Sequence, residues 1–511
     1  MTESLLGLEE ATWLGGIAAA PRAIGAAGLT PDPFAACLAR GTTLVVADAE
    51  SAGGLAGLRD LAALARALGV TLAVRPQGEK SGAGGLPRAV ALAGALDAAV
   101  AAEGPLPALP AAPRDAATRI ERITVQRIAL PLRHLYVSSM YCTPKQDRTL
   151  VCIRLADGTE GWGETNGTPD CAARVVAIAR GWVGRDALRD RAALRRSFAR
   201  ISFDNRHGRN GLAAYAGLDL AAWDAAAKHL GVTLAALLGQ AGPLRPVEVA
   251  CPLPAAVPGR AMDRAEITAH MADLSLAPRV AELAAGIAAA HGIRAFKYKS
   301  AATGIDWDIA ALTALRATLP PGTRLRCDPN GAYSPEEARR LVAGTAALDL
   351  EFHEDPTDAL EGFARLREAG AGRLASNMCL IEPPDLVAAH RLGLTDLVVL
   401  GDIFYWGGIA GLRDASAVAA RLGLTPSLHS FYETAVATAA NWQMAQALGL
   451  DAHHPMDCGV TSLAEDIVAP GVLTVRDGRL TGPAGQGIGL APDPARIAAL
   501  ALADPVVIPA P

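Results

Sequence analysis

Six short apolar segments in the second half of the chain each carry a polar side chain that is capable of acid–base or metal chemistry. These residues are Lys299, Asp328, Glu354, Asn377, Asp402 and His429. They recur at intervals of 29, 26, 23, 25 and 27 residues, close to one strand–helix unit when about 250 residues form the eight units of a (β/α)₈ barrel. Such barrels carry their chemistry at the carboxyl ends of successive strands. The spacing therefore predicts that the six side chains converge on one pocket.

Three of these residues offer oxygen ligands for a metal ion. Asp328 and Glu354 lie in the motifs DPN and EDP, and Asn377 ends the next apolar segment. Hard oxygen ligands without cysteine or histidine suit Mg²⁺, whose octahedral coordination is completed by water and substrate. Each residue alone could instead cap a helix or bind a loop. Three in phase with successive strands predict a Mg²⁺ site.

Two lysines stand two residues apart in the segment IRAFKYK. In a strand this spacing puts Lys297 and Lys299 on the same face, here the barrel interior. A lysine in the interior is costly unless it is functional or paired. Two like charges near a divalent cation should lower the pKa of each lysine and prepare one as a base. The alternative is a surface pair on an edge strand.

Asp402 and His429 end adjacent strands and form a candidate dyad. A carboxylate that accepts from one imidazole nitrogen selects the tautomer and leaves the other nitrogen as general base or acid. Taken alone, the pair could equally be a buried structural hydrogen bond. Asn330 follows Asp328 by two residues and could hydrogen-bond a developing oxyanion, or it could simply be a turn residue of DPNG.

Together these groups predict proton abstraction next to a carboxylate. The metal ion and a cationic lysine would stabilise the enediolate as it forms. Bases on opposite sides of the carbon then allow two outcomes. Reprotonation gives racemisation or epimerisation, and loss of a β-hydroxyl gives dehydration.

The elements that must position these groups follow from the sequence pattern. Strands alternate with Ala/Leu-rich helices over residues 246–460, which predicts a parallel (β/α) barrel that forms the catalytic domain. Residues 118–245 begin with antiparallel strands and continue into a long helical run, which predicts an α+β domain. A proline-rich linker occupies residues 105–117. Residues 461–511 contain a hairpin signal at Asp477-Gly478 and are expected to return to the α+β domain.

The first hundred residues resemble part of the barrel. With one offset of 354, GGLAGLRD at residues 53–60 aligns with GGIAGLRD at residues 407–414. Asp48 then matches Asp402 and Glu79 matches Glu433, but Arg75 stands in the place of His429. The segment contains nothing like KYK, CDPN or HEDP. Residues 1–104 are therefore predicted to be a degenerate partial copy of the last barrel units. We expect a role in packing or assembly, against this chain or another subunit.

Composition narrows the class of protein. A chain of 511 residues suggests two or three domains. Its net charge of −5, without a concentrated basic region, argues against nucleic acid or an anionic membrane surface as partner. Eight scattered cysteines without a CxxC pair indicate reduced thiols. The N-terminus lacks a basic n-region, and no apolar run is long enough for a membrane span. We expect a soluble cytoplasmic protein.

The segments FKYKS, RCDPNGAYS, HEDP, LASNM, LGDIFYWGG and PSLHS, in this order, resemble the enolase superfamily. Within it, the chain looks like the mandelate racemase/muconate lactonizing branch and like glucarate dehydratase-like acid-sugar dehydratases. The resemblance covers about residues 118–495. It implies an α/β fold, a modified (β/α)₈ TIM-like barrel with an α+β capping domain, and Mg²⁺ as cofactor. It also implies Asp328, Glu354 and Asn377 as ligands, Lys297 and Lys299 as the KxK lysines, and Asp402–His429 as the dyad.

The resemblance also implies that loops of the capping domain choose the substrate. Here these loops are LRHLYVSSMYC and GETNGTPD, in which Arg133, His134, Tyr136 and Thr165 are candidates for substrate contact. They could equally be solvated loop residues. The segment HSFYE departs from the His-Ser-Asn-rich pattern of typical glucarate dehydratases, which adds Glu433 to the substrate-binding candidates. The first hundred residues lie outside the usual plan of the family.

These observations predict a Mg²⁺-dependent dehydratase, a carbon–oxygen lyase, that acts on a sugar acid such as an aldarate or aldonate. His429 or Lys299 would remove the α-proton, and the group on the other side would assist departure of the 3-hydroxyl. One alternative is a racemase or epimerase of a hydroxy acid, and another is a catalytically inactive scaffold. The expected partners are a small carboxylate substrate and further copies of the chain.

Overall fold

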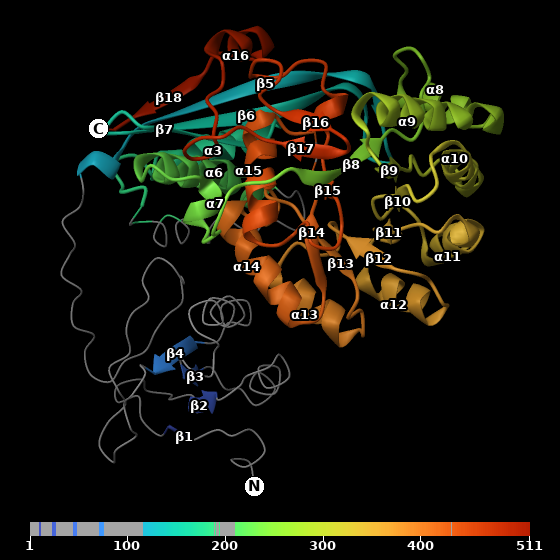
Figure 1. Ribbon diagram of the computed structural model, residues 1–511, viewed down its shortest axis with the longest axis horizontal. Coiled ribbons are helices and arrows are strands. Elements are labelled where there is room, and N and C mark those ends of the chain that lie inside the picture. The colour runs from blue at the N-terminus through green and yellow to red at the C-terminus, as the bar shows by residue number, and fades with distance from the viewer. Residues whose placement is uncertain are drawn as a thin grey trace. The chain divides into compact units, whose positions relative to one another are not determined.

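The computed structural model describes residues 116–188, 190, 194, 210–430 and 432–510, together with four short strands in the first hundred residues (Figure 1). The predicted linker at residues 105–117 falls almost entirely outside the described residues, as do the repeat segment 53–60 and Glu79. None of the described helices is long and apolar enough to cross a bilayer.

The catalytic half of the described chain is a parallel β-barrel. Its strands are β8 (Val247–Leu253), β9 (Ala295–Lys299), β10 (Arg324–Asp328), β11 (Phe352–Glu354), β12 (Leu374–Ser376), β13 (Val398–Gly401), β14 (Thr425–Leu428) and β15 (Met456–Asp457). Neighbours in the chain are neighbours in the sheet from β8 to β14, and β15 pairs in parallel with β8. The last strand thus returns to the first, so the sheet curves into the predicted TIM-like barrel.

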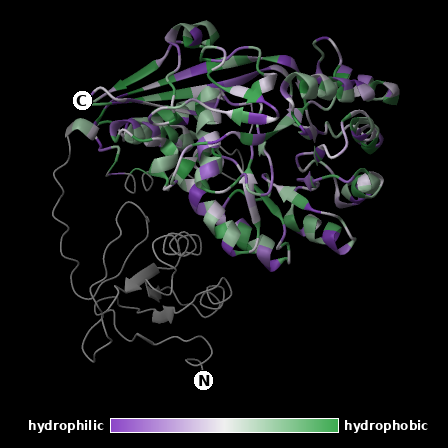
Figure 2. Ribbon diagram, viewed as in Figure 1, coloured by the Kyte–Doolittle hydropathy of each residue, from purple (hydrophilic) through white to green (hydrophobic). Residues whose placement is uncertain are grey.

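Helices follow these strands along the chain. They are α8 (Arg264–His270), α9 (Pro278–His291), α10 (Ile305–Thr318), α11 (Pro335–Thr345), α12 (Leu360–Glu368), α13 (Pro383–Arg391), α14 (Gly408–Arg421) and α15 (Ala435–Ala447). Local sequence sets their ends: Ser334 and Glu337 form a capping box at the start of α11, and the left-handed Gly292 ends α9. Hydrophobic and hydrophilic stretches share these helices in Figure 2, as expected for amphipathic helices around a sheet.

The α+β domain is built on an antiparallel sheet. Its strands are β5 (Ile120–Val137), β6 (Cys142–Leu155), β7 (Glu160–Asn166) and, from the C-terminal tail, β18 (Val506–Pro509), in the order β18-β5-β6-β7. Its helices are α3 (Pro169–Ala179), α6 (Asn210–His229) and α7 (Leu234–Leu237). Gly163 lets α6 lie directly on β7, because a Cβ at this position would stand 2.0 Å from the carbonyl oxygen of Gly217.

The C-terminal tail connects the two domains. Strands β16 (Thr474–Arg476) and β17 (Arg479–Thr481) form a hairpin whose turn residues Asp477 and Gly478 have positive φ, and β17 pairs with β8. Asp224 of α6 accepts a hydrogen bond from the Ile488 amide at 2.8 Å. The short elements of the described chain are α16 (Pro494–Leu500), η1 (Ala116–Thr118), η3 (Leu274–Leu276), η4 (Ala346–Leu348) and η5 (Val460–Ser462).

Three of the four described strands of the first hundred residues agree with the sequence repeat. The four strands are β1 (Glu10–Ala11), β2 (Ala23–Ala26), β3 (Leu44–Asp48) and β4 (Thr71–Arg75), and β2, β3 and β4 are parallel. Strands β3 and β4 pair Leu44 with Thr71, and in the same way β13 and β14 pair Val398 with Thr425. Both pairs are related by the offset of 354, so the extension repeats the strand register of the last barrel units as well as their sequence.

Registers also show how the copy differs from the barrel. Ala23 pairs with Leu44, as Ala375 pairs with Val398. Strand pairing thus matches Ala23 with Ala375, an offset of 352 for this strand, and Gly25 occupies the position that Asn377 has in the barrel. This substitution removes a side-chain oxygen from the position of a candidate metal ligand. The proposed role of the extension in packing or assembly stays a prediction.

Candidate active site

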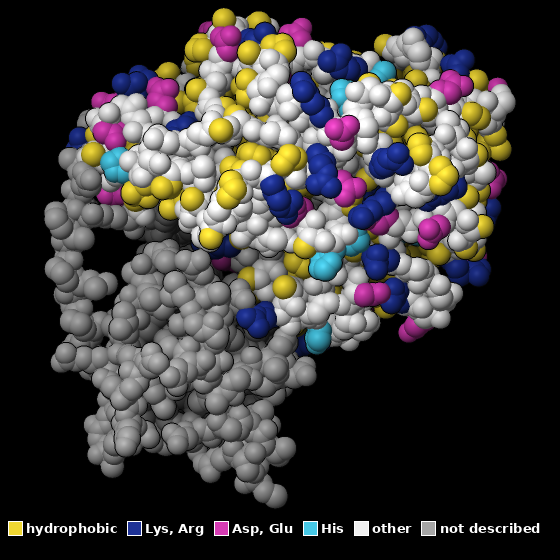
Figure 3. Space-filling model, in the orientation of Figure 1, with side chains coloured by type: hydrophobic (Ala, Val, Ile, Leu, Met, Phe, Trp, Pro, Cys, Tyr) yellow, Lys and Arg dark blue, Asp and Glu magenta, His cyan; other side chains and the backbone are white. Residues whose placement is uncertain are grey.

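The charged groups of the site lie at the carboxyl ends of the barrel strands and are withdrawn from solvent. On the molecular face drawn in Figure 3, cationic and anionic side chains are interspersed at the surface. In contrast, Lys297, Lys299, Asp328 and Glu354 are residues of which at most 2% of the surface is exposed. Strand register explains their proximity, because β9 and β10 pair Lys299 directly with Asp328. Lys299 Nζ donates a hydrogen bond to Asp328 Oδ2.

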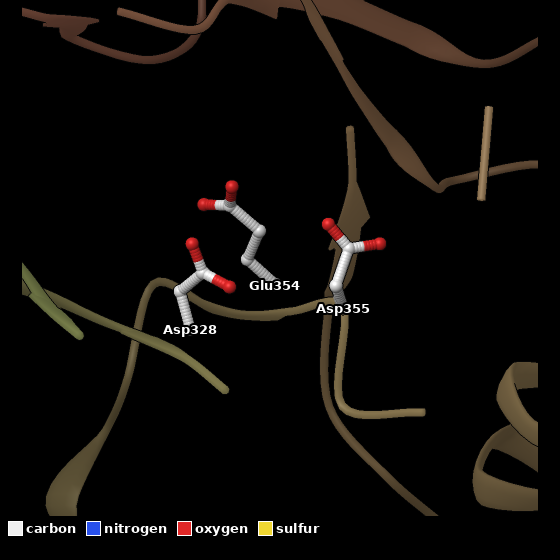
Figure 4. Close-up of side chains that lie close together, drawn as sticks. All are labelled: Asp328, Glu354 and Asp355. Atoms are coloured by element: carbon white, nitrogen blue, oxygen red, sulfur yellow. The ribbon is translucent and has the colours of Figure 1, made fainter. Parts of the chain in front are cut away.

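Acidic groups gather at the ends of β10 and β11. Oxygens of Asp328, Glu354 and Asp355 all lie within 4.8 Å of one another, and Figure 4 shows the first two carboxylates side by side. Burial and the neighbouring Asp328 carboxylate raise the pKa of Glu354 well above its ordinary value. A divalent cation would relieve this repulsion. The all-oxygen donor set therefore fits a hard cation such as Mg²⁺.

Asp355 was not among the predicted site residues, and its contacts suggest a supporting role. Its carboxylate accepts hydrogen bonds from Ser376 Oγ at 2.6 Å and from the amides of Asn377 and Met378 at 3.0 and 3.1 Å. These bonds hold the segment that carries Asn377. Asn377 Oδ1 is buried and has no hydrogen-bond partner among the described residues. Buried polar atoms normally have a partner, so this oxygen fits the role of a cation ligand. The structure thus brings all three predicted ligands to neighbouring strand ends.

The two lysines do lie in the barrel interior, where without a metal ion the carboxylates that pair with them raise the pKa of each. The lowering predicted beside a bound divalent cation stays a prediction. Lys297 Nζ contacts both Glu354, at 3.0 Å, and Asp457. Burial by itself lowers the pKa of Lys299, but the Asp328 carboxylate overcomes this, and the pKa lies well above its ordinary value. The pKa of Lys297 is raised for the same kind of reason, by Asp457 and Glu354 against burial. The sequence argument weighed the like charge of the lysines and left out the carboxylates that pair with them.

Asp402 and His429 form the predicted contact. His429 Nδ1 lies 2.9 Å from Asp402 Oδ2, and because the carboxylate only accepts, Nδ1 carries the proton. Asp402 is oriented by the Phe404 amide, which donates to its Oδ1 at 2.7 Å. Burial lowers the pKa of His429 well below its usual value, and the charges of Lys297 and Lys299 lower it further. His429 is therefore neutral near pH 7 and suited to accept a proton.

Asn330 takes the turn role that the sequence left open. Its φ of 55° is left-handed, a conformation that asparagine tolerates well. Its backbone amide donates to Asp328 Oδ1 at 2.8 Å, and its side-chain amide donates to Asp328 Oδ2 at 3.2 Å. Asn330 therefore orients the carboxylate of a candidate ligand.

Tyr136 is the capping-domain candidate that the structure brings to the site. At the tip of the β5–β6 hairpin, Ser139 bonds the carbonyl oxygens of Ser300 and Pro329 at 2.7 and 2.9 Å. These two residues immediately follow Lys299 and Asp328, so the hairpin lies on the strand ends. The Tyr136 ring is 2% exposed and packs edge-on against Tyr432 at 4.8 Å. Burial raises the pKa of the Tyr136 hydroxyl, while the nearby charge of Lys299 lowers this pKa and that of Asp328 raises it.

The four other substrate candidates have different surroundings. Arg133 and His134 line a groove of about 610 Å³ together with α9 and residues 471–476. Thr165 is fully buried, and its hydroxyl donates to the Ala213 carbonyl oxygen at 2.5 Å; its contact with substrate stays a prediction. Glu433 lies close to the dyad in sequence and is buried, where Ser430 Oγ donates to its Oε2.

Sequence reasoning missed a buried ionic network beneath the strand ends. Asp457 accepts from Lys297 and, at 2.7 Å, from Arg326. Arg326 also donates to Glu351 at 2.6 Å, and Glu351 lies 2.7 Å from His454 Nδ1. A signal for Asp457 was present, since it follows His429 by 28 residues and so continues the series of intervals.

The pKa of Glu351 leads to a prediction about stability. Burial raises this pKa, but the Arg326 guanidinium and His454 lower it more, to about 2 from an ordinary value of 4.5. A depressed carboxyl pKa adds stability above pH 4.5 that is lost as the pH falls towards 2. We expect Glu351→Gln to lower the free energy of unfolding by about 3 kcal/mol at pH 6, and by less as the solution is acidified. Urea unfolding between pH 6 and 3.5 measures this difference.

The exposed Glu368 at the end of α12 supplies the control. Glu368→Gln should leave the unfolding free energy within about 0.5 kcal/mol of the wild type at each pH. A difference between wild type and Glu351→Gln that stays constant with pH would contradict the assignment.

Comparison with known families agrees with the fold and the site. Residues 279–496 match the family described as enolase C-terminal domain-like. Residues 122–239 match the N-terminal domain of mandelate racemase / muconate lactonizing enzyme. The two matches fall on the barrel with its tail and on the antiparallel capping sheet with its helices.

Two curated relatives are similar over most of this chain. A probable glucarate dehydratase of Streptomyces coelicolor is 29% identical over 386 residues, which is 70% of this chain and 85% of the relative. An L-Lys-D/L-Arg epimerase of Methylococcus capsulatus is 27% identical over 384 residues, which is 73% of this chain and 99% of the relative.

Solved structures extend the comparison to three dimensions. An enolase from Streptomyces coelicolor is 32% identical with a TM-score of 0.66, and the match covers 75% of this chain and 96% of that one. An enolase from Thermobispora bispora, complexed with magnesium and formate, is 28% identical with a TM-score of 0.63, covering 75% of this chain and 92% of that one.

Fold and site together define a barrel enzyme that carries acid–base groups at the ends of its strands. The chain belongs to the enolase superfamily, in its mandelate racemase and muconate lactonizing branch.

Proposed function

We propose that the chain is a Mg²⁺-dependent dehydratase of acid sugars, an aldarate or aldonate hydro-lyase. The observation that carries this proposal is one buried site that holds Lys299, the Asp402–His429 dyad and a cluster of acidic oxygens. His429 is close enough to the site lysines for their charges to act on its pKa. The similarity to a probable glucarate dehydratase supports this choice of substrate class.

Asp328, Glu354 and Asn377 would hold the metal ion. Their oxygens suit Mg²⁺, and a solved relative was crystallised with magnesium and formate. When bound, Mg²⁺ supplies positive charge that stabilises the negative charge developing on the substrate carboxylate. Asn330 and Asp355 would keep two of the ligands in place through the hydrogen bonds already described.

The residues of the chain divide the proton transfers between them. One base, the neutral His429 or an unprotonated Lys299, takes the α-proton, and the electron pair of the C–H bond moves towards the carboxylate to give an enediolate. The raised pKa of Lys299 beside Asp328 favours His429 as this base. The group on the other side then gives a proton to the 3-hydroxyl. The C–O bond breaks, water leaves, and the resulting enol becomes a 2-keto-3-deoxy acid. The configuration of the α-carbon decides which base acts first.

Epimerisation is the competing function, and one comparison favours it. The Methylococcus capsulatus epimerase aligns over 99% of its own length, and two bases in one site suit reprotonation as well as elimination. An inactive scaffold is the third reading. The complete set of candidate ligands and bases argues against it, because a site without function has no reason to keep buried charges together.

A screen of acid sugars tests the proposal. We expect Mg²⁺-dependent release of a keto acid from at least one aldarate or aldonate, and loss of this activity in EDTA that excess Mg²⁺ restores. The reaction should be run in deuterated water. Recovered substrate that carries deuterium and an inverted centre, without keto acid, would identify an epimerase and exclude dehydration. No exchange and no product across the library would favour the scaffold.

A further inference from the structure

The capping sheet holds the polypeptide that follows His429. Glu164 stands on β7 and is fully buried. Its Oε1 accepts from the Thr434 amide at 3.0 Å, and its Oε2 accepts from Thr434 Oγ1 at 2.6 Å and from the Ala437 amide at 3.2 Å. One carboxylate of the capping domain thus receives three hydrogen bonds from a barrel segment that begins five residues after His429.

The charges around Glu164 favour its ionised form at this place. Arg148 on the neighbouring strand β6 lies 3.3 Å from Glu164 Oε1, and both side chains are fully buried. Thr434 is the N-cap of α15, a helix of 13 residues, and Ala437 is in its first turn. The amides at a helix N-terminus attract an anion. Glu164 is therefore an acceptor for this helix that comes from a different domain.

The same contacts hold a strained residue between His429 and the helix. Tyr432 has a left-handed φ of 52°, which is rare for an aromatic residue and persists only where the surroundings enforce it. Arg148 Nε donates to the Tyr432 carbonyl oxygen at 3.4 Å, and Tyr136 packs against its ring. Three strands of the capping sheet, β5, β6 and β7, thus contact this short segment.

We propose that Glu164 is a positioning residue for the catalytic base: by holding Thr434 and the start of α15, it keeps His429 in place for proton transfer. The capping domain then does more than cover the substrate, because its sheet sets the position of a group in the barrel. This inference rests on the proposed function of His429 as an acid–base group.

Protonation of Glu164 should change the dependence of kcat on pH. Burial raises its pKa to about 7, against the opposing effect of Arg148. The charged groups that face it are Arg148 from β6 and Glu433 from the segment after β14. Protonation weakens Glu164 as an acceptor, so the segment should loosen as the pH falls below 7. We expect kcat to fall below pH 7, and this limb to be absent in Glu164→Gln.

The first arm of the test needs no substrate. Hydrogen–deuterium exchange with mass spectrometry should show the amides of Thr434 and Ala437 exchanging about 10- to 100-fold faster in Glu164→Gln. Glu160→Gln, on the same strand with a side chain 38% exposed, is the control and should match the wild type. Unchanged exchange in Glu164→Gln would overturn the inference, whatever the substrate proves to be.

The second arm measures turnover of the acid sugar found in the screen. We expect kcat of Glu164→Gln to fall about 10- to 100-fold, since a small displacement of a catalytic group has this cost, with KM within about threefold. Glu164→Asp keeps the charge and shortens the side chain without touching the N-cap hydroxyl of Thr434, so it should show a smaller loss and decides the question if Glu164→Gln does not fold. Faster exchange with unchanged kcat would overturn a role in catalysis. If the wild type showed no activity, the proposed function would be refuted. The hydrogen–deuterium exchange experiment would then still test whether Glu164 holds Thr434 and Ala437.

Discussion

Replacing Lys299 with methionine or His429 with asparagine is expected to reduce kcat for dehydration by at least about 10²- to 10⁴-fold, the usual contribution of a general acid or base. Both side chains are buried at the site, where His429 is oriented by Asp402 and Lys299 by Asp328. Among the described residues, no second lysine hydrogen-bonds Asp328 and no second histidine hydrogen-bonds Asp402. Steady-state kinetics with the acid sugar identified in the screen measure the loss.

Partial reactions separate the two bases. If His429 takes the α-proton, His429→Asn should abolish exchange of that proton with deuterated water, while Lys299→Met should retain it and lose only elimination. The opposite pattern would assign Lys299 as the first base. Lys145→Met, at a lysine whose side chain is 48% exposed, is the control. Wild-type rates in either active-site variant would contradict the catalytic role assigned to that residue.

Periodicity made the barrel and its cluster predictable from sequence. Lys297 and Lys299 share a face because strand side chains alternate, and parallel pairing then places Lys299 beside Asp328. The same reasoning carries Glu354, Asn377, Asp402 and His429 to neighbouring strand ends. These residues follow from strand length and order alone, and both are strong features of an α/β barrel sequence.

The capping residues were harder to predict because a small irregularity decides which way they face. Strand β5 loses its register with β6 between Pro131 and Tyr136. A register shift reverses the faces of the residues that follow. Tyr136 packs against Tyr432 of the barrel, whereas Arg133 lines a groove beside α9. His134 borders both this groove and a small cavity that Tyr136 also lines. Nothing in the sequence LRHLYV marks this shift.

Contacts between domains were invisible for another reason. Glu164 looked like part of a substrate loop, but it bonds a helix 270 residues further along the chain. The pairing that raises the pKa of Lys297 was missed similarly, since Asp457 was not included among the partners of this lysine. Patterns along one strand reveal which residues face the interior, and the net charge there depends on every strand that contributes to it.

Asp457→Asn is expected to destabilise the protein by about 3–5 kcal/mol, because it leaves two buried cations without their shared anion. Asp457 is fully buried and contacts both Lys297 and Arg326. The amide of asparagine keeps the size of the side chain and one acceptor oxygen, so the change isolates the charge. Denaturation in urea, with Asp306→Asn as control, measures the loss.

Asp306 is a suitable control because its side chain is 77% exposed and lies 3.9 Å from Arg340. A surface pair of this kind contributes at most about 1 kcal/mol. Removing the positive partner as well should recover part of the loss: the double variant Asp457→Asn/Arg326→Met is expected to be more stable than the sum of the single effects, since the two residues share one network. Two results would contradict this expectation: losses of unfolding free energy that are strictly additive in the double variant, or a loss below about 1 kcal/mol for Asp457→Asn alone. Either would mean that the barrel interior screens these charges as solvent does, and that Lys297 does not depend on the Asp457 carboxylate.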